Sequence, residues 1–127
     1  MDTYRHLKAW QLCQILVLEV YRVTKSLPES ERFGLTDQLR RAAVSACANL
    51  AEGYARRGAG ELGRFAGISV GSLAEVDALL EIARRLGYVT DEAHSELRAH
   101  YVAASKTTFA LMRACVLRRS QPKRARG

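Results

Sequence analysis

The chain has 127 residues, of which 48% are hydrophobic and 26% charged, as expected for one soluble globular domain. It contains no run of about 18 apolar residues that could span a membrane, and its first residues, MDTYRHLKAW, lack an apolar signal core. We therefore expect a cytoplasmic protein. The net charge of +7 is concentrated at one end, because residues 118–127 hold five basic and no acidic residues, leaving 15 basic against 13 acidic residues in 1–117. This predicts a folded body, 1–118, and a disordered basic tail, 119–127.

The first two predicted helices lie on either side of Pro28. A helix over residues 5–26 is predicted because apolar residues recur at steps of four and three, which keeps one face toward a partner helix. This stripe consists of Ala9, Cys13, Leu16, Val20, Val23 and Leu27. Pro28 ends the helix, since proline disfavours helical geometry in the residue before it. A second helix begins between Glu31 and Thr36 and continues to about Arg57. Its inner face is rich in alanine and consists of Leu35, Leu39, Ala42, Ala46, Asn49, Leu50 and Gly53.

The third and fourth predicted helices meet near Gly87, which is suited to a left-handed helix cap. The third helix extends from about Glu61 to Leu86 and carries two neighbouring stripes. One stripe consists of Leu62, Phe65, Ser69, Leu73, Val76, Leu80 and Ala83, and the other of Ile68, Ser72, Glu75, Leu79, Ile82 and Leu86. Thr90 caps the fourth helix, which continues to about Arg118. Its stripe consists of Leu97, Tyr101, Ala104, Thr108, Leu111 and Cys115.

No segment alternates apolar and polar residues at strand spacing, so the predicted fold class is all-α. Four helices of about 20–28 residues with short connections favour an antiparallel up-down four-helix bundle.

The segment GAGELG, residues 58–63, matches the G-x-G-x-x-G pattern of dinucleotide-binding folds. That pattern holds a pyrophosphate only where a strand precedes the glycines and a helix follows them. Here the preceding segment, TDQLRRAAVSACANLAEGYARR, is predicted to be helical. We therefore interpret GAGELG as a turn leading into the third helix. An anion could still bind at that helix's N-terminus, beside Arg56, Arg57 and Arg64.

Residues that could catalyse a reaction or hold a metal do not gather in this sequence. The histidines share no face and form neither H-E-x-x-H nor Glu-x-x-His motifs. Cys13, Cys47 and Cys115 are far apart and form no C-x-x-C pair, so we interpret them as reduced, buried thiols. We expect no enzymatic activity, no cofactor and no metal.

Polar residues recur along one side of the second helix and meet two from the third. This set consists of Arg41, Ser45, Asn49 and Glu52, with Ser72 and Glu75 on the third helix. An antiparallel hairpin could join them in a polar network. We interpret the network as structural, because such networks fix helix register more often than they catalyse.

Glycines on the third helix suggest a closely packed backbone, and surplus apolar surface predicts a homo-oligomer. Gly63, Gly67 and Gly71 lie on one face of the third helix, where each costs about 1 kcal/mol relative to alanine. Three glycines on one face suggest that another backbone comes close, within the subunit or across subunits. The second stripe of the third helix and several large residues off the main stripes also leave more apolar surface than one small bundle hides. These large residues are Trp10, Tyr21 and Tyr54.

Two long segments, FGLTDQLRRAAVSACANLAEGYARR and ELGRFAGISVGSLAEVDALLEIARRLGYV, resemble the proteins encoded by intervening sequences within 23S ribosomal RNA genes, also labelled the S23 ribosomal protein family. The matching features are Phe33, Leu35, Gln38, Arg40, Arg41, Ala42, Ala43, Ser45, Asn49, Ala51, Glu52, Gly53, Glu61, Arg64, Phe65, Gly71, Ser72, Leu73, Glu75, Leu86, Gly87 and Tyr88. The sequence departs from the family at Ala46 and Cys47, where Ser-Ile-Pro is common, and at Gly67.

The resemblance implies a closed up-down bundle that assembles into a ring, typically a homopentamer, without established enzymatic activity. It also implies similarity in fold to the accessory variability determinant protein of diversity-generating retroelements, which engages nucleic acid and a reverse transcriptase.

Our functional hypothesis is a non-enzymatic, homo-oligomeric module that binds nucleic acid by charge, with structured RNA as the first candidate and other RNA or DNA as further ones. The candidate contacts are Arg40, Arg56, Arg57, Arg64, Arg118, Arg119, Lys123, Arg124 and Arg126. The alternative is a structural or protein-interaction scaffold without a nucleic-acid role, with a protein such as a reverse transcriptase as one candidate partner.

Overall fold

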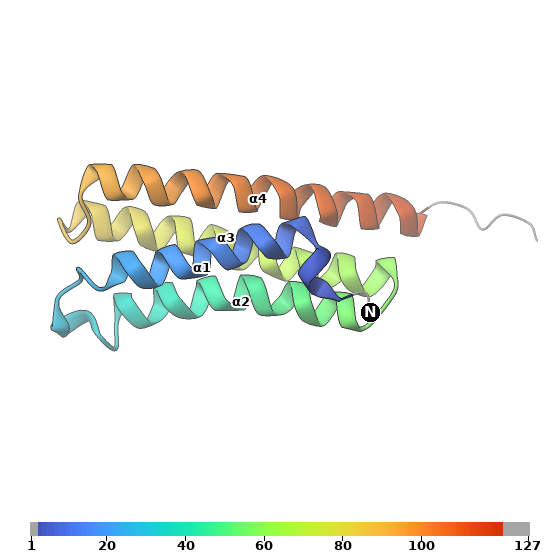
Figure 1. Ribbon diagram of the computed structural model, residues 1–127, viewed down its shortest axis with the longest axis horizontal. Coiled ribbons are helices and arrows are strands. Elements are labelled where there is room, and N and C mark those ends of the chain that lie inside the picture. The colour runs from blue at the N-terminus through green and yellow to red at the C-terminus, as the bar shows by residue number, and fades with distance from the viewer. Residues whose placement is uncertain (1–2, 121–127) are drawn as a thin grey trace, which may run out of the picture.

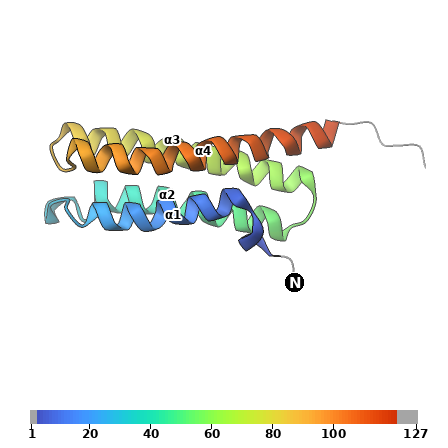
Figure 2. The ribbon, with the colours of Figure 1, turned by 45° about the horizontal axis from the view of Figure 1, so that its top comes forward.

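The computed structural model describes residues 3–120, with side chains through residue 118, and every regular element in this range is helical. Its four long helices are α1 (Lys8–Thr24), α2 (Leu35–Ala55), α3 (Ala59–Arg85) and α4 (Asp91–Ser120), accompanied by two short 3-10 helices, η1 (Tyr4–His6) and η2 (Glu29–Glu31). The long helices lie side by side (Figure 1). One layer holds α1 and α2 and the other α3 and α4 (Figure 2). Contacts join α1 to α2, α2 to α3, α3 to α4 and α4 to α1. The predicted all-α fold with four helices is thus confirmed.

The first helix is shorter than predicted. Leu7 is extended, with φ −69° and ψ 121°, and separates η1 from α1. At the other end, the Thr24 hydroxyl donates to the carbonyl of Val20 at 2.7 Å, and the helix stops four residues before Pro28. With 17 residues, α1 is about 26 Å long, against about 45 Å for the 30 residues of α4. The difference in length leaves one end of the bundle without α1.

The predicted capping residues Gly87 and Thr90 lie in the connection between α3 and α4 and cap the two helices. Gly87 takes a left-handed φ of 79°, and its amide donates to the carbonyl of Arg84 at 2.9 Å. Thr90 then caps α4, because its hydroxyl accepts a hydrogen bond from the amide of Ala93 at 3.1 Å. Both helix ends are therefore satisfied by the residues that the sequence indicates.

The core contains the predicted stripes almost unchanged. Every residue of the α1 stripe is buried, and the buried centre of the bundle is formed by leucines from all four helices together with small residues of α2 and α3. The fully buried leucines are Leu16, Leu39, Leu50, Leu73, Leu80 and Leu97. Three members of the second stripe lie outside this core, since Ile68, Ile82 and Leu86 are 42%, 48% and 54% exposed, whereas Leu79 packs against it.

Glycine and serine bring α2 and α3 close together. A Cβ at Gly53 would lie 2.7 Å from the Cβ of Phe65, too close for any side chain. Farther along the seam, the buried Ser69 hydroxyl donates to the carbonyl of Ala46 at 2.7 Å. On the α4 side, a Cβ at Gly63 would lie 2.9 Å from the Cβ of Cys115. Close backbone approach thus occurs within the subunit at Gly53 and Gly63.

We expect a pH-dependent contribution to stability from Glu81, near the end of α3. Hydrogen bonds from Arg84 and then Arg85 lower the pKa of Glu81 from its ordinary value of 4.5 to about 2. A folded-state pKa below the unfolded one stabilises the protein above the unfolded pKa, and this stabilisation is lost as pH falls toward 2. The Glu81→Gln variant should therefore melt slightly below the unchanged chain at pH 7 and level with it near pH 2. Thermal melts across this pH range check this, and a gap that persists at pH 2 contradicts it.

Candidate nucleic-acid interface

Four of the candidate arginines gather at one end of the bundle. Arg56 and Arg57 follow α2, Arg64 lies in the second turn of α3, and Arg118 belongs to the last turns of α4. The α2–α3 turn and the end of α4 lie at the same end of the molecule in Figure 1. Helices that are separate in sequence therefore bring these four positive charges together.

The turn between α2 and α3 contains an unusual backbone. Arg57 has a φ of +56°, and it is the one non-glycine residue with a positive φ in the described range 3–120. This conformation costs an L-residue roughly 1–2 kcal/mol. Gly58 follows with a φ of +108° and begins α3 without a side-chain cap. The first amide groups of α3 therefore face this end of the bundle without a capping side chain.

Two of the arginines are already paired with carboxylates. Arg56 forms ion pairs with Glu52 at 3.1 Å and Glu61 at 3.7 Å, and Arg64 forms one with Glu61 at 3.0 Å. Both guanidinium groups also lie over the ring of Phe65, at 5.0 and 4.5 Å from its centroid. The hydrogen bond from Arg64 lowers the pKa of Glu61, so this carboxylate stays charged and compensates part of the positive charge.

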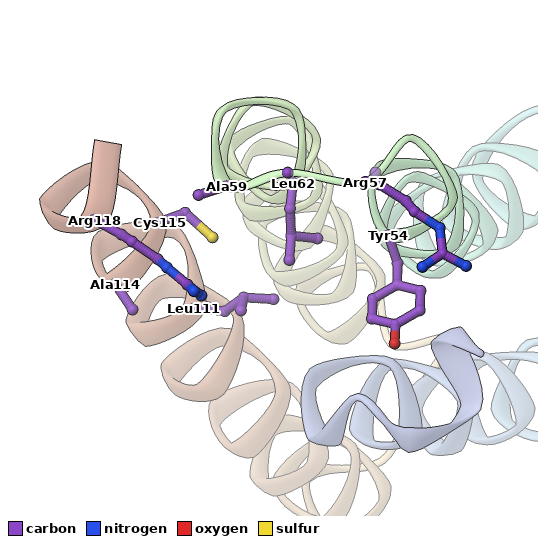
Figure 3. A pocket seen from close by; sticks show the side chains of 10 residues that line it. Tyr54, Arg57, Ala59, Leu62, Leu111, Ala114, Cys115 and Arg118 are labelled. Atoms are coloured by element: carbon purple, nitrogen blue, oxygen red, sulfur yellow. The ribbon is translucent and has the colours of Figure 1, made fainter. Parts of the chain in front are cut away.

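Arg57 and Arg118 instead flank a pocket of about 520 Å³ (Figure 3). Its walls are mainly apolar and come from α2, α3 and α4. The lining residues are Gly53, Tyr54, Arg57, Gly58, Ala59, Leu62, Leu111, Ala114, Cys115 and Arg118. Neither Arg57 nor Arg118 forms an ion pair with a carboxylate of the described residues.

Of the other predicted contacts, Arg40 lies away from this group. The Arg40 side chain donates to the Thr24 hydroxyl at 2.9 Å and lies 4.6 Å above the Tyr21 ring, between α2 and α1. Arg119 is described only as part of the α4 backbone. The other three predicted contacts, Lys123, Arg124 and Arg126, lie outside the described residues.

The predicted polar network is smaller in the structure. Ser45 and Ser72 are hydrogen-bonded at 3.0 Å, and the Asn49 amide donates to the Ser45 hydroxyl at 3.1 Å and to its carbonyl at 2.8 Å. Glu75 is exposed and is not hydrogen-bonded to these three side chains.

The two charged members of the predicted set on α2 point elsewhere. Arg41 pairs with Asp37 at 2.9 Å, and Glu52 pairs with Arg56. Arg41 does not reach the serines because its guanidinium pairs with the charged carboxylate of Asp37, one turn earlier on the same helix. Of the predicted network, the structure joins only Ser45, Asn49 and Ser72, which form a small polar contact between α2 and α3.

The structure gives neither the glycine motif nor the cysteines the surroundings of a dinucleotide site or a reactive thiol. The segment before Gly58 is α2, so no strand leads into the glycines. Cys13 and Cys47 both have a pKa raised to about 11 by burial, and burial also raises the pKa of Cys115, with Arg118 opposing the shift. These thiols are protonated and weakly nucleophilic near neutral pH. No three His, Cys, Asp or Glu side chains within residues 3–118 cluster as metal ligands.

The sequence patterns do not predict the pocket between Arg57 and Arg118. The signal was present in the helix lengths, because a first helix much shorter than the fourth leaves the apolar end of α3 and α4 uncovered. Leu62 and Leu111 belong to the predicted core stripes, yet both are only half-buried and line the pocket.

The fold and this basic end together define an all-α, four-helix protein with an arginine-rich end. The model of the 23S rRNA-intervening sequence protein family matches residues 5–110, and the chain belongs to this family. A crystal structure of a protein of unknown function from the S23 ribosomal protein family of Bacteroides thetaiotaomicron VPI-5482 is similar, with a TM-score of 0.72 and 17% identity over 82% of this chain and 97% of that one. Among curated proteins, none matches this sequence. No helix within residues 3–120 is long and apolar enough to cross a bilayer.

Proposed function

We propose that this protein is a non-enzymatic, cytoplasmic, homo-oligomeric module that binds structured RNA by charge. The observation that carries this proposal is the convergence of Arg56, Arg57, Arg64 and Arg118 at one end of the bundle, where the sequence after α4 holds three more basic residues, Lys123, Arg124 and Arg126. Membership of a family encoded within ribosomal RNA genes is consistent with an RNA partner. Such contacts would fix phosphates and give little sequence specificity.

Salt dependence tests the proposal. Binding of a fluorescent RNA hairpin should weaken about 100-fold between 50 and 200 mM salt if four phosphates are contacted, since the slope is about −0.9 per contact. Fluorescence anisotropy at four salt concentrations measures this. A chain that ends at Ser120 keeps every described residue and should retain binding with a smaller slope. Absence of binding by the full chain at 50 mM salt would refute the proposal.

We further propose an antiparallel up-down bundle that assembles into a ring, with a pentamer as the expected size. The helix direction is supported by the colour gradient, which alternates along successive helices in Figure 1. A ring needs two different contact surfaces on each subunit, and the exposed apolar residues form two. The α1–α2 groove is lined by Tyr4, Trp10, Gln14, Val17, Leu18, Val44, Cys47, Ala48 and Ala51. The α3 outer stripe consists of Ile68, Gly71, Ala74, Ala78 and Ile82, which are all exposed.

The same two surfaces favour the alternative, a protein-interaction scaffold without a nucleic-acid role. Leu18 is 61% exposed and Val44 is 41% exposed, and exposed apolar surface of this kind marks protein contacts. Under this alternative, the arginines serve solubility and local ion pairs, as Arg56 and Arg64 already do with Glu61. Co-purified nucleic acid, measured by absorbance at 260 and 280 nm, favours the first function, and its absence with retained assembly favours the second.

A further inference from the structure

The pocket at the basic end is large enough for a small planar ligand. Its volume of about 520 Å³ lies within the range of ligand sites in proteins. In Figure 3, Leu62 stands in the middle of the pocket wall, with Leu111, Ala114 and Cys115 on the α4 side and Tyr54 on the α2 side. The interior is therefore apolar, with one aromatic ring among the residues that line it.

The rim of this pocket is positive. Figure 3 places Arg57 and Arg118 on opposite sides of Leu62, each carried by a different element. The carboxylates near this end, Glu52 and Glu61, are paired with other arginines. The start of α3 at Gly58 adds amide groups without a capping side chain. The pocket thus combines apolar walls with separated anion-binding groups on its edge.

The backbone at Arg57 adds an independent observation. A glycine would adopt its left-handed φ of +56° freely, whereas arginine does so at a cost in stability. Strained residues of this kind concentrate at functional sites. The left-handed conformation belongs to the position that ends α2, where glycine is the usual residue, so the arginine found there is consistent with a role for its guanidinium at the pocket.

We infer that this pocket receives a single unpaired base of RNA, while Arg57 and Arg118 hold the phosphates on its two sides. This inference rests on the proposed RNA-binding function and adds a preference for unpaired nucleotides. An unpaired nucleotide has the matching chemistry, since its flat base has stacking faces and its sugar is flanked by two anionic phosphates. Aromatic and apolar contacts accept any base, because every base has a π-face.

Three RNA hairpins test this inference by fluorescence anisotropy at one salt concentration. The first is fully paired, the second carries one bulged uridine, and the third carries an abasic site in place of that uridine. The bulged hairpin should bind about 5- to 150-fold more tightly than the other two, the range that base stacking supplies. Equal binding of all three would overturn the inference and leave the proposed function standing, whereas failure of the paired hairpin to bind at low salt would remove the proposed function itself.

Two variants locate the effect in the pocket. Ala114→Trp fills the pocket without changing charge, at an exposed helix position, and should abolish the preference for the bulge while the paired hairpin binds as before. Arg57→Gly should lose the preference as well, yet melt at the same or a higher temperature because it relieves the strained φ. Arg113→Gln is the matched control, since it removes one exposed charge from α4 outside the pocket and should keep the preference.

The solution mass of the Ala114→Trp variant tests whether the pocket is instead a contact between subunits. An unchanged mass together with a lost preference supports the base-binding pocket. A smaller assembly would assign the pocket to contact between subunits and overturn the inference, as would an Arg57→Gly variant that keeps the full preference for the bulge.

Discussion

Replacement of Gly53 by valine is expected to destabilise the folded chain by about 3 kcal/mol. The Cβ that any substitution adds would lie 2.7 Å from the Cβ of Phe65 and 3.4 Å from the Cα of Leu62. Both atoms are fixed by the α3 backbone, so the two helices must move apart. Overpacking of this kind typically costs 1–3 kcal/mol, and the branched methyl groups of valine place the expected value at about the upper limit. Urea titration followed by circular dichroism gives the free energy of unfolding.

Gly71→Ala is the matched control for this substitution. Gly71 also lies within a helix, but apart from the backbone of its own helix no atom of the isolated subunit lies within 4 Å of the position that its Cβ would take. The variant should therefore gain up to about 1 kcal/mol from the better helix propensity of alanine. If Gly53→Val unfolds at the same urea concentration as the unchanged chain, the close packing of α2 on α3 is not needed for stability.

Replacement of Leu18 by arginine is expected to break the proposed assembly while leaving the subunit folded. Leu18 is 61% exposed in the isolated chain, so an arginine there remains hydrated in the monomer. In a ring, the same side chain would be buried in the α1–α2 groove without a partner, at about 3 kcal/mol for each contact. Each contact would then weaken more than 100-fold. Light scattering after size-exclusion chromatography measures the mass, and far-ultraviolet circular dichroism reports the helices.

Ser95→Arg adds the same charge at an exposed position of α4 and should leave the mass unchanged. A monomeric mass for the unchanged chain would contradict the ring before any variant is compared. An assembly that survives Leu18→Arg would instead show that the α1–α2 groove is not a contact surface.

The helices and most of the core follow from the sequence because apolar spacing and capping residues are local signals. The stripe from Ala9 to Leu27 is buried as predicted, and Gly87 and Thr90 cap their helices as predicted. The predicted start of α1, at residue 5, lies three residues before the observed start, because η1 and the extended Leu7 share the composition of the helix that follows.

The charged side chains could be assigned less well. Arg40 and Arg41 are adjacent and point about 100° apart, and the sequence alone does not say which of them turns toward the bundle. The structure turns Arg40 toward Thr24, and Arg41 pairs with Asp37. Such choices depend on the rotation of the whole helix, which is set by distant packing contacts.

The pocket could not be predicted because it also depends on how the helices are placed relative to one another. It exists because three helices extend past the end of a fourth, which is a property of their relative placement. No local pattern encodes that placement, although four of the residues that line the pocket belong to stripes that the sequence identifies: Gly53, Leu62, Leu111 and Cys115.

Most of the ion pairs described here join residues three or four positions apart on the same helix, such as Arg22 with Glu19 and Arg41 with Asp37. Such pairs stabilise a helix without selecting its neighbours. The pairing of α2 with α3 depends instead on small residues at their contact, because Gly53 and Ser69 let the two helices approach closely. Surface charges can then diverge freely between related proteins while the architecture persists, in keeping with a common fold at 17% identity.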